Sequence, residues 1–378
     1  MLPSWRQSMR IRGASFTVSF RHMSPLKYLL SVALTGFLAA FLHLTLFFYQ
    51  LGAPIKAEYW LYESAIVKRM IADSIKEPKL VVLGGSNALF GINSTMLENA
   101  LGIPTVNLAL HASLSIDYLL QESRKVLQPH DHILLSLEYV LYARKSPYSL
   151  WFTNQIMTWD TAYFWDLSIE DKGSFVRSVP LNRLIAGALA QLQRKRSANF
   201  LSRTLANAED VHLRHARALT DTSTSAWEVY SVVNIDAHGD VRHHPQRQSL
   251  EDEGYFISYP FVLSARVWEE LREFSEYCQT RDITLYIVWP PTMKNPKLDF
   301  NSLVVQNHLQ QLQSHMLQLH MQTLGLPWEF FYERALFSDT AYHLTPAGRS
   351  KHTEALLRYL RPLLLAPSHQ REAVLQPR

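Results

Sequence analysis

The sequence is poor in cysteine, and this scarcity excludes two classes of site. Its 378 residues include one cysteine, Cys278. A single cysteine forms no internal disulfide and builds no metal site from several thiolates. The formal net charge is +4, but no basic stripe falls on a recognisable nucleic-acid-binding module. We therefore expect no nucleic-acid partner, no metal and no other cofactor.

The amino-terminal part lacks charge of one sign and then lacks charge altogether. Residues 1–27 contain no Asp or Glu, and residues 28–49 contain no Asp, Glu, Lys or Arg. A helix over the second stretch would be about 33 Å long, which is enough to cross a bilayer. The basic residues that precede it are Arg6, Arg10, Arg12, Arg21 and Lys27.

Three interpretations of residues 28–49 compete. A cleaved signal peptide would have a shorter apolar region and a small-residue cleavage site, whereas here Pro54 follows the run. A buried core helix fits poorly because the run is apolar on every face. An uncleaved anchor fits best. The positive-inside rule then predicts a cytoplasmic tail over residues 1–27, with the remainder of the chain outside the cytoplasm.

The remaining residues carry the pattern of a folded α/β domain. Hydrophobic residues make up 47% and charged residues 19%, which favours a folded chain over a disordered one. Amphipathic stretches alternate with short apolar runs, a pattern typical of parallel strands joined by helices. We predict a flavodoxin-like, doubly wound parallel sheet of about five strands. The predicted strands are Leu80–Leu83, Thr105–Leu108, Ile133–Leu137, Ile283–Trp289 and Trp328–Phe331.

The predicted helices lie between these strands and after the last one. The first of them is an amphipathic connector that leads from the anchor to the first strand. The others follow from apolar residues that recur at helical spacing. They cover residues 55–78, 94–101, 116–127, 267–278 and 303–324, with a last helix that begins after His343.

A helical insertion is expected at residues 145–255, inside an extracytoplasmic domain that spans residues 55–366. Its predicted helix, Leu181–Leu201, carries Arg194-Lys195-Arg196, which suits a solvated face; contact with anionic lipid or glycan is the alternative. Residues 367–378 are expected to be a disordered tail. A polar group in the insertion fits no metal-ligand spacing and predicts a loop rather than a metal cluster. It consists of Asp236, His238, Asp240, His243 and His244.

The candidate functional residues share one position in the predicted fold. Each lies just past the carboxyl end of a predicted strand, and in a doubly wound sheet those ends form one edge. They are Ser86, Asn107, Ala112, Glu138, Pro290, Pro291, Asp339 and His343.

Three of these residues supply the parts of a nucleophilic site. A serine hydroxyl needs an imidazole to take its proton, and the imidazole needs a carboxylate to hold its tautomer. Ser86, His343 and Asp339 provide these groups. The oxyanion donors would be the Ser86 N–H, an N–H near Ala112 and the Asn107 amide. Glu138 is either a substrate-facing residue or a solvated carboxylate at a strand end. In the alternative, noncatalytic interpretation, His343 only caps a helix and Ser86 only occupies a turn.

These residues resemble the motifs of the SGNH (GDSL-type) hydrolase superfamily. The resemblance lies in Gly84-Gly85-Ser86, in the run from Asn107 to Ala112 and in the Asp339…His343-Leu344 ending. It covers about residues 78–142 and 265–360. There are departures from the family pattern. Gly85 replaces the usual Asp, Ala112 stands where Gly is common, and Leu137-Glu138-Tyr139 replaces Gly-x-Asn-Asp. Asp339 and His343 are four apart rather than three.

An anchor followed by such a domain is similar to the D-alanine-transfer protein of teichoic acid synthesis and to alginate acetylation proteins. The resemblance implies a single-pass protein of the bacterial cytoplasmic membrane whose periplasmic domain is a serine esterase or O-acyltransferase. Its substrate would be an acyl ester, acetyl above all, of an envelope polysaccharide. A membrane-bound O-acyltransferase would be its partner. The alternative is a catalytically silent module of the same fold that binds glycan or serves as a scaffold for that partner.

Overall fold

The computed structural model describes residues 24–196, 206–221, 229–245, 262–294 and 302–365. The chain divides into two compact units, residues 1–49 and residues 50–378. The predicted tail at residues 367–378, the end of the predicted helix Leu181–Leu201 and most of the predicted basic tail lie outside the described residues.

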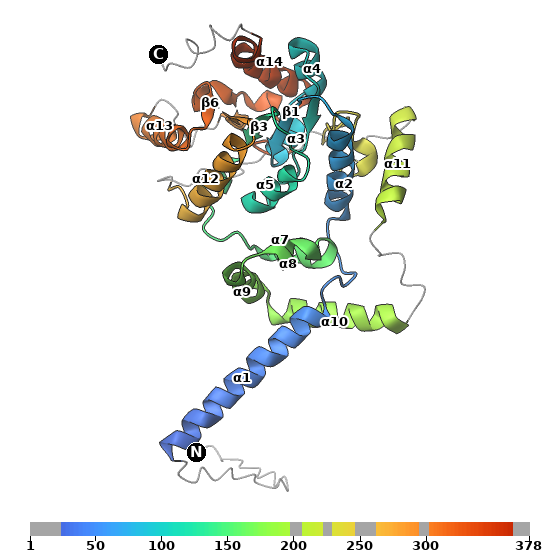
Figure 1. Cartoon of the computed structure of the whole chain (residues 1–378), viewed down its shortest axis with the longest axis vertical. Helices are drawn as coiled ribbons and strands as arrows, with labels where there is room; N and C mark the ends of the chain where they lie inside the picture. Colours follow the sequence, from blue (N-terminus) through green and yellow to red (C-terminus); the bar gives the residue numbers. More distant parts are fainter. Residues whose placement is uncertain (1–23, 197–205, 222–228, 246–261, 295–301, 366–378) are drawn as a thin grey trace, which may run out of the picture. The chain divides into compact units, whose positions relative to one another are not determined.

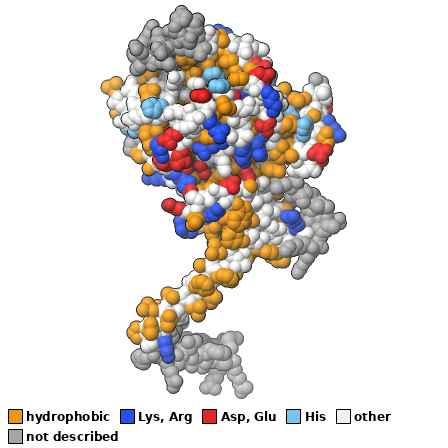
Figure 2. Space-filling model, in the orientation of Figure 1, with side chains coloured by type: hydrophobic (Ala, Val, Ile, Leu, Met, Phe, Trp, Pro, Cys, Tyr) orange, Lys and Arg blue, Asp and Glu red, His pale blue; other side chains and the backbone are white. Residues whose placement is uncertain are grey.

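In the first unit, the described residues form one helix, α1 (Pro25–Tyr49). Figure 1 shows this helix in blue. Apolar side chains make up most of its surface, and most of its residues are exposed (Figure 2). In the part of the chain that the structure describes, it is the one helix with the length and composition to cross a membrane.

The second unit contains a five-stranded parallel sheet with the order β2-β1-β3-β4-β6. This is the flavodoxin-like order. The second strand, β2, lies on one side of β1, and the later strands are added on the other side, beginning with β3. The sheet strands are β1 (Leu80–Gly84), β2 (Thr105–Asn107), β3 (His132–Ser136), β4 (Thr284–Val288) and β6 (Gln322–Leu324).

The structure confirms the first four predicted strands, but the fifth prediction is wrong. The fifth strand of the sheet is Gln322–Leu324, inside the stretch predicted to end the helix over 303–324. The helix stops at Gln318, and His320 turns the chain with a φ of 56°. Pro327 instead begins a 3₁₀ helix over most of the predicted strand, and the Glu329 carboxylate accepts the Leu326 N–H at 2.6 Å.

Helices cover both faces of the sheet (Figure 1). On one face, Ser275 of α12 donates to Leu319 O at the end of α13, and α5 packs beside α12. On the other face, α4 and α14 pack together. These helices and the others of the α/β part are α2 (Tyr59–Ser74), α3 (Ser86–Gly91), α4 (Ser94–Leu101), α5 (Ile116–Arg124), α6 (Tyr139–Tyr142), α12 (Ala265–Gln279), α13 (Leu303–Gln318) and α14 (Pro346–Leu364).

Two very short strands lie beyond the carboxyl end of the main sheet. β5 (Thr292–Met293) follows Pro290-Pro291 and pairs in parallel with β7 (Phe331–Tyr332). The chain then passes through the 3₁₀ helix η4 (Arg334–Leu336) to the start of α14. The 3₁₀ helix before β7 is η3 (Pro327–Phe330). This arrangement brings the carboxyl-terminal loop to the end of the sheet at which Ser86 lies.

The insertion is helical in its described parts, as predicted. Its helices are α7 (Leu150–Trp159), α8 (Thr161–Asp166), α9 (Ile169–Ser178), α10 (Leu181–Arg196), α11 (Ala208–Thr220) and the 3₁₀ helix η2 (Val232–Asn234). In Figure 1, α7 and α8 lie between α10 and the sheet. α11 packs along α2, so the insertion returns to the α/β part before α12.

Candidate active site

Ser86 is the first residue of α3, directly after the glycine pair that ends β1. Neither glycine has a positive φ; both are required by close approach of β3 and the loop after it. A Cβ on Gly84 would overlap the carbonyl of Ser136, and a Cβ on Gly85 would lie 2.7 Å from the Glu138 carboxyl carbon. The turn therefore packs tightly on its neighbour, and Ser86 is 7% exposed.

Glu138 packs against this turn. Its Oε1 accepts the Asn87 N–H at 2.8 Å and lies 3.5 Å from Ser86 Oγ, the outer limit of a hydrogen bond. Its side chain is 1% exposed, so the prediction of a solvated carboxylate is wrong. In the structure Glu138 forms part of the support for the serine turn, and its contact with Ser86 leaves the substrate-facing alternative a prediction.

The electrostatic state of Glu138 follows from its burial. Removal from water raises its pKa, and the Asn87 N–H, His343 and Arg144 offset only part of that effect. Among the described residues its Oε2 atom has no hydrogen-bond partner. A buried carboxylate with one unpaired oxygen is costly, which is typical of functional positions.

Asp339 and His343 form a hydrogen-bonded pair in the loop between η4 and α14. His343 Nδ1 lies 2.9 Å from Asp339 Oδ1, so four positions of separation still let the carboxylate meet the ring. The carboxylate accepts, which places the hydrogen on Nδ1 and leaves Nε2 as the acceptor nitrogen. Burial favours a higher pKa for Asp339, but the hydrogen bond and charge of His343 outweigh it and hold the pKa below its usual range.

Local backbone bonds fix this loop. His343 O accepts from Ser338 N at 2.8 Å, and Thr340 Oγ1 accepts from His343 N at 3.0 Å. Thr345 caps α14 by accepting the Gly348 N–H, and Pro346 occupies the first helical position. His343 is therefore held just before a capped helix.

Phe90 connects the two halves of the site. Ser86 and Phe90 are four residues apart on α3 and so share one face of that helix. The Phe90 ring packs on the His343 ring with centroids 4.5 Å apart. His343 also acts electrostatically on Glu138, which contacts Ser86. Ser86, Glu138 and the Asp339–His343 pair thus surround the same end of β1 and β3.

Asn107 serves a different purpose from the one predicted. Its Nδ2 donates to Asp240 Oδ1 at 2.8 Å and to Ala88 O at 3.3 Å, and its Oδ1 accepts from Ala109 N. Both amide hydrogens are thus engaged within the protein. The prediction that this amide donates to an oxyanion is therefore wrong. Asn107 instead links the end of β2 to Ala88 and Asp240.

Ala112 lies in the loop after β2, which Arg144 holds. One guanidinium nitrogen donates to Ala112 O at 2.8 Å and another to Leu114 O at 3.0 Å. The sequence analysis missed Arg144 because a single arginine in a loop, 32 positions from Ala112, gives no local signal. Its function in the structure is to fix the loop in which the predicted oxyanion donor lies.

A second imidazole, that of His111, directly precedes Ala112 in the loop after β2. The His111 ring stacks on Trp151 of α7 with centroids 4.9 Å apart. Burial, together with the charges of His343 and Arg144, lowers the pKa of His111 to about 4, so the ring is neutral at neutral pH. Its Nδ1 accepts the Ser113 N–H at 3.0 Å, which places its hydrogen on Nε2. His111 therefore offers an N–H donor at this end of the sheet.

The polar group in the insertion supports the site and does not form a metal centre. No cluster of three or more His, Cys, Asp or Glu in the described ranges could hold a metal ion. Asp240 is buried and accepts from Ser94 N, Ser94 Oγ and the Asn107 amide. Gly239 has a φ of 82°, which suits glycine, and approaches Asn107 O closely.

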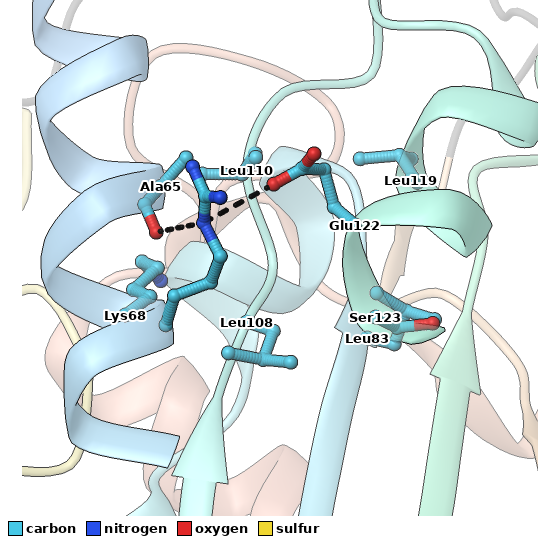
Figure 3. Close-up of a pocket in the computed structure, with 9 residues that line it drawn as sticks. Ala65, Lys68, Leu83, Leu108, Leu110, Leu119, Glu122 and Ser123 are labelled. Atoms are coloured by element: carbon cyan, nitrogen blue, oxygen red, sulfur yellow. Dashed lines mark hydrogen bonds and ion pairs between the residues drawn. The ribbon is translucent and has the colours of Figure 1, made fainter. Parts of the chain in front are cut away.

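A narrow cavity elsewhere in the second unit is not part of this site (Figure 3). It lies between α2, β1 and α5. Arg69, which lines it, donates to Ala65 O and forms an ion pair with the Glu122 carboxylate. Apolar side chains form most of its lining. None of the predicted site residues lines it.

No protein-family model matches this chain, and no curated protein matches it. Neither comparison therefore supplies an activity, a substrate or a partner. The function has to be argued from the arrangement at the end of the sheet.

Proposed function

We propose that this chain is an SGNH-type serine esterase or O-acyltransferase. Ser86 is the nucleophile, His343 the general base and acid, and Asp339 the residue that holds the His343 tautomer. The proposed substrate is an acyl ester, acetyl above all, of an envelope polysaccharide. The enzyme is anchored by α1 in the bacterial cytoplasmic membrane, works on the periplasmic side and has a membrane-bound O-acyltransferase as its partner.

The observation that carries this proposal is the Asp339–His343 hydrogen bond beside the face of α3 that bears Ser86. A histidine that only capped a helix would not need a partly buried carboxylate that accepts from its Nδ1. The ionised state of Asp339, which its lowered pKa favours, suits the stabilisation of an imidazolium. The order of the three residues along the chain also agrees with the motif resemblance.

The reaction follows from these positions. Ser86 Oγ attacks the acyl carbonyl carbon while His343 Nε2 takes the hydroxyl proton, and the carbonyl oxygen becomes an oxyanion. The tetrahedral intermediate collapses, the C–O bond to the sugar breaks, and His343 returns the proton to the departing sugar oxygen. Water or a second sugar hydroxyl then attacks the acyl-serine by the same steps, giving hydrolysis or transfer.

The oxyanion requires donors already in place. With Asn107 engaged elsewhere, we assign the Ser86 N–H, an N–H in the Arg144-held loop at Ala112 and the His111 Nε2–H. Loss of one donor of this kind costs about 2.7–4 kcal/mol of activation free energy.

Covalent labelling by a fluorophosphonate probe tests the proposal. Serine attack forms an O–P bond and expels fluoride, with the proton passing to His343. We expect the full-length protein in detergent to be labelled at Ser86. Labelling should be lost in Ser86→Ala and in His343→Gln. Ser314→Ala is the matched control, since Ser314 only donates to Gln310 O on an exposed helix. An unlabelled wild-type protein with an intact fold contradicts the proposal.

A second candidate function is a silent module that binds glycan or serves as a scaffold for an acyltransferase. The engagement of the Asn107 amide and the replacement of Gly-x-Asn-Asp by Leu137-Glu138-Tyr139 favour it, because both remove oxyanion donors. This candidate predicts normal acylation of envelope polysaccharide in cells that carry Ser86→Ala. Deletion of residues 28–49 would abolish acylation under either function.

A further inference from the structure

Helix α10 of the insertion exposes large apolar side chains on its outward face. Four large aliphatic residues are exposed at spacings of four, four and three, which places them on a single stripe. Figure 2 shows apolar side chains gathered at the α10 end of the second unit. The stripe consists of Leu181 (53% exposed), Ile185 (46%), Leu189 (54%) and Leu192 (42%).

The inward face of α10 holds the first residues that follow α1. The Gln50 side chain is completely buried, and its Oε1 accepts from Arg183 Nη1 at 2.7 Å. Gly187 leaves the space for this contact, because a Cβ there would lie 2.6 Å from Gln50 Oε1. Gln50 Nε2 contacts the Met157 sulfur of α7 at 3.1 Å.

The next two residues are held in the same way. Gln191 Nε2 donates to Leu51 O at 2.9 Å, and Gly52 N donates to Met157 O at 2.7 Å. Consecutive Cα atoms are about 3.8 Å apart, so Gln50 directly adjoins Tyr49, the last residue of α1. The chain is therefore fixed to α10 at the point where it leaves α1.

The positive charges of α10 suit contact with a negatively charged membrane surface. Residues 181–196 contain no Asp or Glu and end in Arg194-Lys195-Arg196. By comparison, α11 of the same insertion begins with Glu209 and Asp210. An apolar face with basic residues and no acidic ones is the composition of helices that lie in a membrane surface.

We propose that α10 lies in the lipid–water interface at the end of α1, with the Leu181–Leu192 stripe in the headgroup–acyl boundary. The lipid bilayer itself covers the stripe. This inference rests on α1 crossing the membrane and does not depend on the proposed chemistry. The Arg194 end would meet anionic headgroups. The second unit would then be held to the membrane at two places, by its anchor and by its insertion.

Fluorescent labels on single introduced cysteines test the inference. The native Cys278 is 1% exposed and burial raises its pKa to about 12, so it reacts slowly and can stay in place. Cysteines are placed in turn at positions 181, 182, 185, 186, 189, 192 and 193 of the full chain and labelled with an environment-sensitive dye. The protein is reconstituted in phosphatidylcholine vesicles with and without phosphatidylglycerol, and nitroxide-labelled lipids serve as quenchers.

We expect blue-shifted emission and quenching by lipid nitroxide at 181, 185, 189 and 192, with weaker signals at 182, 186 and 193. Phosphatidylglycerol should increase the quenching. Leu213→Cys on α11 is the matched control, because Leu213 is also an exposed helical leucine (48%), and it should stay unquenched. Equal, water-like emission at all positions overturns the inference. Blue-shifted emission without lipid quenching also overturns it, since a protein surface would then cover the stripe.

Discussion

The two halves of the candidate site are built in opposite ways. The Ser86 turn is held by groups distant in the chain, because Glu138 and Ser136 come from β3 and the loop after it. The Asp339–His343 loop is held mostly by bonds within the segment from Leu336 to Gly348. Its distant contacts are a backbone bond from Met293 N to Ala341 O at 3.2 Å and the Tyr230 hydroxyl on Asp339.

This difference predicts different responses to mutation. A change in the loop around His343 should alter chemistry and leave most of the fold intact. A change in the Ser86 turn should affect stability and chemistry together, because the turn is part of the packing between two central strands. The following predictions test that contrast, beginning with the largest effect.

Asp339→Asn should lower kcat for hydrolysis of p-nitrophenyl acetate by about 10⁴-fold, because an amide no longer holds the His343 tautomer. The free energy of unfolding should change little, since the loop keeps its backbone bonds. Steady-state kinetics and urea unfolding measure the two quantities. Activity close to wild type would show that His343 works without this carboxylate.

Gly85→Ala should destabilise the protein by about 1–3 kcal/mol, the usual cost of an overpacked core position. The φ of −88° at this position suits alanine, so the cost arises from the contact with the Glu138 carboxylate. Urea unfolding and probe labelling should both show the loss. Gly173→Ala is the control, because its nearest neighbour would be 3.6 Å away.

The double variant Gly85→Ala/Glu138→Ala locates the cause of that loss. Removal of the carboxylate relieves the overlap, so the double variant should be less destabilised than the sum of its single variants. Strict additivity in the free energies of unfolding would place the strain elsewhere in the turn.

Glu138→Gln should become more stable relative to wild type as pH rises. Burial raises the pKa of Glu138, so the folded protein holds this proton above the pH at which the unfolded chain releases it. The stabilisation is present below the unfolded pKa of 4.5 and is lost as pH rises through the raised folded value. Thermal unfolding from about pH 4 to pH 8 measures the difference. A constant difference across this range contradicts the assignment.

Tyr230→Phe should have the smallest effect, a decrease in kcat of no more than about fivefold, because one hydrogen bond is worth about 1 kcal/mol. Tyr230 OH donates to Asp339 Oδ2 at 3.3 Å, which is long, and its ring is 45% exposed, so water can replace the hydroxyl. A loss as large as that of Asp339→Asn would mean that Tyr230 helps to position the carboxylate.

The parts of the fold that could be predicted are those with a local signal. Three of the first four strands, Leu80–Leu83, Ile133–Leu137 and Ile283–Trp289, are largely apolar runs that end near turn residues, which is typical of buried parallel strands. The edge strand Gln322–Leu324 has no such run, because two of its three residues are polar and only partly buried. The apolar Trp328–Phe331 is more strand-like in composition, yet Pro327 starts a 3₁₀ turn there.

The same rule separates the site residues. The Asp339–His343 pair lies within one loop, so spacing alone could suggest it. The buried positions of Glu138 and of Asp240 depend on partners that lie 51 and 133 positions away. The spacing of apolar residues along the sequence gives no signal for such long-range contacts. Glu138 was assigned a solvated alternative, and Asp240 a place in a polar loop, because composition alone favours exposure for both.

The close contact between Gly85 and Glu138 bears on how related proteins could be found. The motif that this chain resembles has an aspartate directly before the serine, and here the space for that side chain is filled by a carboxylate from the loop after another strand. A carboxylate therefore lies beside the proposed nucleophile although residue 85 is a glycine. Linear patterns would overlook proteins of this kind, whereas a three-dimensional template of serine, buried carboxylate and imidazole would retrieve them.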